Sequence, residues 1–134
     1  MRSQERMCIM GKFVIKKTNT GYTFSLKAGN GEVICTGGEV FNTLASCQNS
    51  IESVRKSAAA ANIEDQTVEG YEKQVHPKFE IYLDKKGEFR FRLKARNGEP
   101  IAASEGYTAK AGCKNGIESV IRNAADSDVV LPEE

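Results

Sequence analysis

The chain has 134 residues, 40% of them hydrophobic, and a formal net charge of +1. Such a length fits one domain with a real core, and so small a charge gives no overall field to attract nucleic acid or a membrane. No apolar run approaches the roughly 20 residues of a membrane helix, and the first residues lack the apolar core of a secretory signal. We therefore expect a single cytoplasmic domain over 1–134, with a loose lead-in at 1–11 and no membrane partner.

The cysteines do not form a ligand pattern. Cys8, Cys35, Cys47 and Cys113 show no C-x-x-C spacing, and His76 is the only histidine. This composition predicts no metal site and no cofactor. A cytoplasmic chain with its own core also needs no disulfides.

Two blocks of sequence occur twice. LKAGNGEVI at 26–34 returns as LKARNGEPI at 93–101, and CQNSIESV at 47–54 returns as CKNGIESV at 113–120. Such self-similarity indicates a repeated structural unit. We assign repeat 1 to 12–69, a connection to 70–77 and repeat 2 to 78–131.

Each repeat begins with the pattern of three strands. The first strand is expected at 13–15 and 79–83, the second at 22–28 and 89–95, and the third at 32–36 and 99–103. The second strand alternates apolar and polar residues, which is typical of a half-buried strand. Asn30-Gly31 and Asn97-Gly98 then predict two-residue type I′ turns. In that register Pro100 faces Ala95, Arg96 faces Glu99, and the sheet edge beside Pro100 is open.

A helix is expected next in each repeat, capped by Asn42 or Thr108. Apolar residues at spacings of three and four give each helix one buried face, and a short β-like run follows at 67–71 and 128–132. We predict an α+β fold of two βββα(β) units, with one antiparallel sheet and both helices on one face. One unit makes too small a sheet to be stable alone, so we expect a monomer with internal pseudo-two-fold symmetry, a dimer being the alternative. The predicted core is Phe13, Ile15, Phe24, Leu26, Cys47, Ile51, Val54, Phe79, Ile81, Phe89, Phe91, Leu93, Cys113, Ile117 and Val120.

The pattern F-x-I, then G-x-F/Y-x-F-x-L-K-A-x-N-G-E-x-I, then C-x-N-x-I-E-S-V resembles the YegP-like family of small bacterial proteins. It spans residues 12–130 in two copies. The resemblance implies β(3)-α-β units in a single sheet, with the last strands exchanged between the repeats. It implies no activity. Repeat 1 departs from the pattern at 37–41, and it has Leu44 where repeat 2 has Lys110.

Several repeated polar residues are candidates for chemistry, but each has a structural interpretation. Cys47 and Cys113 lie on the apolar helix face, where a cysteine behaves as a small hydrophobe. His76 lies in the connection without a partner. Glu52 and Glu118, with Ser53 and Ser119, fit a solvated helix surface, and Asn49 and Asn115 fit hydrogen bonds to a neighbouring loop or strand.

One basic strip has an electrostatic argument for function. Arg90, Arg92, Lys94 and Arg96 alternate along one strand face, and Tyr82 on the preceding strand is a candidate neighbour. Arginines in a row suit phosphates, and an aromatic side chain suits a stacked base. An ordinary solvated sheet face is the alternative, because Glu80, Glu99 and Glu105 could neutralise the strip.

Three functional hypotheses remain. The first is a non-enzymatic module that acts by binding or assembly, because no acid–base pair, metal set or phosphate loop is evident. The second is a nucleic-acid-binding protein that uses the basic strip. The third is a thiol redox enzyme centred on Cys113.

Overall fold

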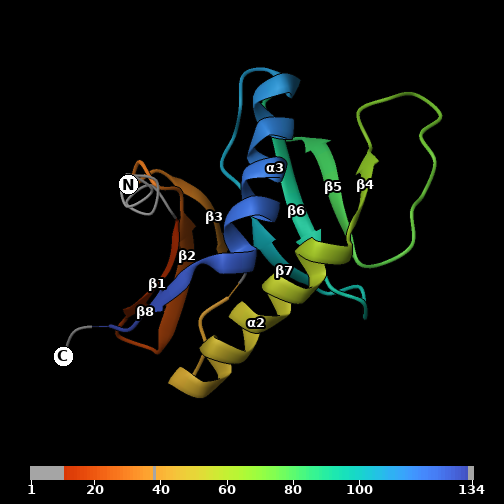
Figure 1. The fold of residues 1–134 in the computed structure, drawn as a ribbon. Helices are drawn as coiled ribbons and strands as arrows, with labels where there is room; N and C mark the ends of the chain where they lie inside the picture. The colour runs from red at the N-terminus through yellow and green to blue at the C-terminus, as the bar shows by residue number, and fades with distance from the viewer. Residues whose placement is uncertain (1–10, 38, 133–134) are drawn as a thin grey trace, which may run out of the picture.

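The computed structural model describes residues 11–37 and 39–132, without the side chain of Asp126. Two groups of strands alternate with two long helices along the described chain (Figure 1). The elements are β1 (Lys12–Lys17), β2 (Tyr22–Lys27), β3 (Val33–Gly37), α2 (Leu44–Ala60), β4 (Asn62–Asp65), β5 (Lys78–Leu83), β6 (Phe89–Lys94), β7 (Pro100–Ala103), α3 (Lys110–Asp126) and β8 (Asp128–Val130).

The described strands form one eight-stranded sheet in the order β4-β5-β6-β7-β3-β2-β1-β8. The repeats meet where β3 pairs with β7. The last strand of each repeat pairs with the first strand of the other, β4 with β5 and β8 with β1, which confirms the strand exchange that the resemblance implies. The predicted antiparallel pairing holds for the six inner strands. The two outer pairs are parallel, and neither is joined by a hairpin: segment 66–77 lies between β4 and β5, and most of the chain lies between β1 and β8.

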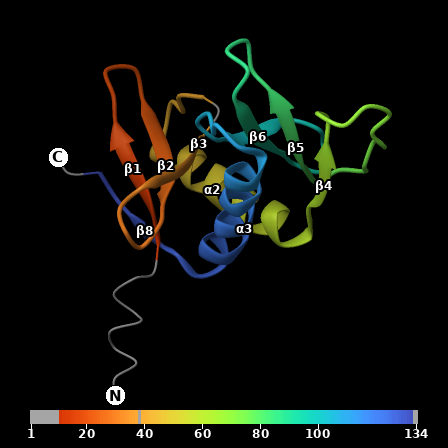
Figure 2. The ribbon, with the colours of Figure 1, turned by 90° about the horizontal axis from the view of Figure 1, so that it is seen from above.

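Both helices lie on the same side of the sheet, as predicted (Figures 1 and 2). Each helix also bridges the repeats, since α2 contacts β2 of its own repeat and β5, β6 and β7 of the other, while α3 contacts β6 and also β1, β2 and β3. The α+β architecture predicted from the repeat is therefore confirmed, and the two copies share one core.

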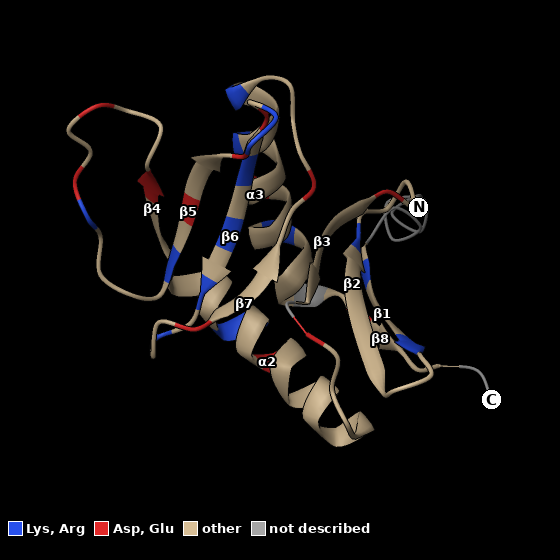
Figure 3. Cartoon of the chain, turned by 180° about the vertical axis from the view of Figure 1, so that it is seen from behind, with Lys and Arg blue, Asp and Glu red and all other residues tan. Residues whose placement is uncertain are grey.

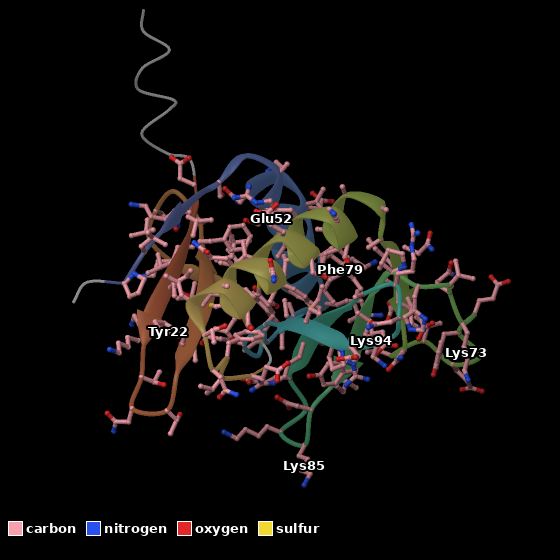
Figure 4. The ribbon with its side chains drawn as sticks, turned by 90° about the horizontal axis from the view of Figure 1, so that it is seen from below. Tyr22, Glu52, Lys73, Phe79, Lys85 and Lys94 are labelled. Atoms are coloured by element: carbon pink, nitrogen blue, oxygen red, sulfur yellow. The ribbon has the colours of Figure 1, made fainter. Side chains whose placement is uncertain are left out.

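The core is the set of apolar side chains between the helices and the sheet. Of the fifteen predicted core residues, fourteen are buried, and Phe89 is half-buried against the cluster. Phe79 lies between α2 and the strands in Figure 4. Paired rings stack at matching places, Phe24 with Phe41 and Phe91 with Tyr107.

The hairpin turns after β2 and β6 differ from the prediction. Each loop has three residues, closed by hydrogen bonds between Ala28 and Glu32 and between Ala95 and Glu99. Only the glycines take positive φ, 89° at Gly31 and 88° at Gly98, so the turns are not type I′. The asparagine side chain instead accepts a hydrogen bond from the N–H two residues later.

This longer loop shifts the register by one residue, so Pro100 lies opposite Lys94 and Arg96 does not face Glu99. β7 pairs with β3 only through Ala102 and Ala103. Pro100 lies outside that pairing, and its one partner among the described strands is Lys94 of β6.

Two further local predictions were wrong. The N-cap positions lie one residue later than expected. Thr43 caps α2, because its side chain accepts from the N–H of Ser46, whereas Ala109 precedes α3 and makes no side-chain cap hydrogen bond. The strand expected at 67–71 is instead β4 at Asn62–Asp65, and 66–70 form turns. The segment NIED has no apolar pattern that would predict a strand. Its buried residue is Glu64, a charged residue that is stabilised by an ion pair with Lys78.

Candidate functional site

The basic strip runs along β6, which carries several Lys and Arg residues beside an acidic residue on β5 (Figure 3), and it ends at Arg96 in the turn after β6. Its members on β6 are already paired with acids. Arg90 Nε donates to Asp84 at 2.7 Å, and Arg92 Nε donates to Glu80 at 2.6 Å. Lys94 lies 3.4 Å from Glu80, and the Arg92 guanidinium lies 4.5 Å from the centre of the Tyr82 ring. The strip is therefore much less basic than the sequence of β6 alone indicates.

A buried charge network lies beneath this strip. Glu64 and Glu80 face each other across β4 and β5 and are only 2% and 3% exposed. Lys78 lies between them, with its Nζ 2.7 Å from Glu64 and 3.2 Å from Glu80. The equivalent positions at the other edge are Val14 and Val130, so only one side of the sheet uses charge here.

The surroundings of Glu64 favour its ionised form. Burial opposes ionisation, but hydrogen bonds from Gln66, Lys78 and the N–H of Gln74 outweigh it and lower the pKa to about 2. The hydrogen bond to Lys78 raises the pKa of the lysine. The network thus fixes β4, β5 and the segment after β4 through matched charges.

The repeated cysteines lie in the core. Cys47 and Cys113 are fully buried, and burial raises the pKa of Cys47 and raises that of Cys113 to about 11. Cys35 is also buried, and burial raises its pKa to about 12. A nucleophilic thiol needs the opposite environment, since the thiolate is the reactive form. Cys8 lies outside the described residues.

The other repeated polar residues face outward. Asn49 and Asn115 are exposed, and the hydrogen bonds predicted for their side chains to a neighbouring loop or strand are not made within the described structure. Glu52 and Glu118 each pair with an arginine of their own helix. His76 is exposed beside Gly98.

A hollow of about 430 Å³, which we call the α2 groove, lies between the C-terminal half of α2 and the turn after β6. Both repeats contribute to it. Its lining residues are Ser53, Lys56, Ser57 and Ala60 from repeat 1, with Pro77, Ala95, Arg96 and Asn97. The volume lies within the range of small-molecule sites. Of the basic strip, Arg96 belongs to it, and Ser53, one of the repeated polar candidates, also lines it.

A second hollow of about 380 Å³ lies along the N-terminal half of α3. Tyr107, Asn115 and Ser119 face the turn after β2 there, and Glu32 and Glu105 make its lining acidic. The two hollows are thus related in position, each between a helix of one repeat and a turn of the other, and opposite in charge.

Within the described chain, no helix is long and apolar enough to cross a membrane. The same residues contain no group of three or more His, Cys, Asp or Glu side chains placed to hold a metal ion.

Comparison with known proteins matches each repeat to a family model and to relatives from several organisms. The model described as "Domain of unknown function (DUF1508)" matches twice, at residues 18–65 and 84–130. A "UPF0339 protein in ptx operon 5'region" from Stutzerimonas stutzeri is 71% identical over 48 residues, which are 36% of this chain and 43% of that protein. A UPF0339 protein from Treponema denticola is 66% identical over 53 residues, 40% of this chain but 91% of that protein. One repeat therefore makes up almost the whole of that relative.

The whole fold also matches a solved structure. The solution structure of yegP from E. coli, described as a protein of unknown function, covers 94% of this chain and 97% of its own. The TM-score is 0.74 at 29% sequence identity. The two-repeat arrangement is therefore shared by both proteins.

Proposed function

We propose that this chain, which belongs to the family defined by the DUF1508 domain and carries that domain twice, is a non-enzymatic module that binds a small ligand in the α2 groove. One observation carries this proposal. The groove is lined by residues that only the union of the two repeats brings together. It combines side chains of Lys, Arg, Ser and Asn with apolar walls, as ligand sites do.

The chemistry of the described side chains favours binding over catalysis. The described thiols are buried, and their pKa values are raised by that burial. His76 is exposed outside the groove. A reaction would need a nucleophile or an acid–base pair within reach of the bound molecule.

We further propose that the protein acts as a monomer in the cytoplasm. Each repeat receives its outer strand from the other, so the chain supplies internally the exchange for which a single repeat would need a second copy. Nucleic acid is a less favoured partner, because the arginines of β6 are paired with Glu80 and Asp84.

The proposal is tested by ligand-observed NMR with a panel of anionic, cationic and neutral metabolites. Ala60 is exposed and lines the groove, so Ala60→Trp should fill the hollow without disturbing the core. Ala59→Trp is the matched control, since Ala59 is also exposed but does not line the groove. We expect at least one ligand to bind the wild type and the control but not Ala60→Trp. A panel with no binder, or binders indifferent to Ala60→Trp, would contradict the proposal.

A further inference from the structure

Two residues that line the α2 groove differ from their equivalents in the other repeat. Ser57 of α2 corresponds to Asn123 of α3, and Pro77 before β5 corresponds to Gly11 before β1. Asn123 closes its side, because its Oδ1 accepts from the N–H of Gly11 at 3.1 Å and its amide donates to Ser119. Any side chain at Gly11 would collide with Asn123 and with the Lys27 carbonyl. Gly11 and Asn123 are therefore closed against each other, and neither lines the second hollow.

The same place in the other half stays open. Pro77 has no N–H to donate, and serine is shorter than asparagine. Ser57 is only 7% exposed and lines the groove, yet its hydroxyl makes no hydrogen bond to any other group in the described part of the chain. A buried hydroxyl without a partner costs free energy, so it favours a ligand that supplies one.

The charges around this hydroxyl are positive. Lys56 and Arg96 line the groove, and neither is in an ion pair with a described residue. Their equivalents are Arg122, which pairs with Glu118, and Gly29. The acidic residue nearest to Arg96 in sequence is Glu99. It does not line the groove, and its carboxylate accepts a hydrogen bond from Asn97. The groove thus holds two cations and a hydroxyl donor that the other repeat does not reproduce.

We propose that the α2 groove binds the phosphate monoester of a small polar molecule such as a sugar. The proposal rests on the proposed function and names its ligand class. Arg96 and Lys56 neutralise the phosphate, because a guanidinium fork and an ammonium both suit its oxygens. Ser57 donates to one of those oxygens. Ala60, Pro77 and Ala95 contact the organic part, for which about 430 Å³ leaves room.

The test is a titration of the labelled full chain followed by two-dimensional NMR. Glucose 6-phosphate is the probe, with glucose and inorganic phosphate as its separate parts. We expect shifts confined to the end of α2 and to 95–97, and affinity that falls as salt rises. Arg96→Gln and Lys56→Gln should each weaken binding about 10-fold or more, as charge-assisted hydrogen bonds predict. Lys85→Gln, at the exposed tip of the β5–β6 hairpin (Figure 4), should change affinity less than about twofold.

Ser57→Asn is the sharpest variant, because it places the residue of the closed half in the open half without changing any charge. It should abolish binding while the spectrum stays folded. If it fails to fold, Arg96→Gln still decides, since Arg96 is exposed in a turn. Phosphate-ester binding that ignores Arg96→Gln and Lys56→Gln overturns the inference. A 5′-phosphorylated oligonucleotide that binds far more tightly also overturns it. If an uncharged ligand binds the wild type but not Ala60→Trp, only the phosphate assignment is wrong. If no ligand binds at all, the proposed function is wrong as well.

Discussion

Arg55 of α2 ties the two repeats together, and its removal should be costly. Its guanidinium donates to the carbonyls of Ala124 and Ser127 at the end of α3, at 3.0 and 2.6 Å. It also lies 5.2 Å from the centre of the buried Phe13 ring. The arginine therefore caps a helix of the other repeat and covers part of the core. Ile121 occupies the equivalent position in α3, so the tie is made once.

The expected loss follows from these contacts. Hydrogen bonds to charged groups usually contribute about 1.5–3 kcal/mol each, and partial exposure of Arg55 reduces the two here to about 1 kcal/mol each. The favourable position at a helix C-terminus adds about 0.3–1 kcal/mol, and the ring contact adds about 0.5–1 kcal/mol. The exposed pair with Glu52 adds little. Arg55→Ala should thus lower the free energy of unfolding by about 3–4 kcal/mol.

Urea unfolding followed by circular dichroism measures this loss, with the slope m checked for constancy. Arg55→Lys keeps the charge but not the fork, so its loss should be intermediate. Arg122→Ala is the control, because that arginine is exposed and its one ion pair, with Glu118, is long at 3.9 Å. The substitution should change the free energy of unfolding by less than about 0.5 kcal/mol. An Arg55→Ala variant no less stable than Arg122→Ala would refute this account.

Three further predictions concern the charge network, the helix–ring contact and the thiols. Folding lowers the pKa of Glu64, so its contribution to stability is present above its ordinary pKa and is lost as pH falls toward about 2. The free energy of unfolding should therefore fall less steeply over that pH window in Glu64→Gln than in the wild type. Equal slopes would contradict this. A Cβ at Gly116 would lie 2.5 Å from the Tyr107 hydroxyl, so Gly116→Ala should destabilise by about 1 kcal/mol after its helix gain is subtracted. The loss should shrink in a Tyr107→Phe background, and a double-mutant cycle without coupling would be evidence against the contact. In Cys8→Ser protein, Cys113 should resist a water-soluble thiol reagent until unfolding, whereas fast native modification would revive the redox hypothesis.

The fold was largely predictable because apolar periodicity decides it. Phe91 and Leu93 alternate on β6, and Cys113, Ile117 and Val120 follow a helical spacing, so element type and buried face were correct. The resemblance, and not periodicity, predicted the strand exchange. β4 was misplaced because a strand whose buried residue is charged shows no apolar pattern.

The α2 groove escaped prediction because it depends on distant positions that differ between the repeats. No local pattern singles out Ser57. Its hydroxyl matters because Pro77, the residue equivalent to Gly11, has no N–H to donate. Aligning the two repeats does place Ser57 against Asn123 and Arg96 against Gly29, and these differences were the available signal. The neutralisation of Arg92 was equally hidden, because Glu80 meets it only through the register of β5 and β6.

The central claim is that the two repeats form one cooperative body, because each supplies a strand and a helix to the other. Native-state hydrogen exchange of the whole chain tests it most directly. The slowest amides of β2 and β6 should open with the same free energy, equal to that of global unfolding, within about 0.5 kcal/mol. If one strand exchanges at a much lower free energy while the other stays protected, the repeats are independent units and this account is wrong.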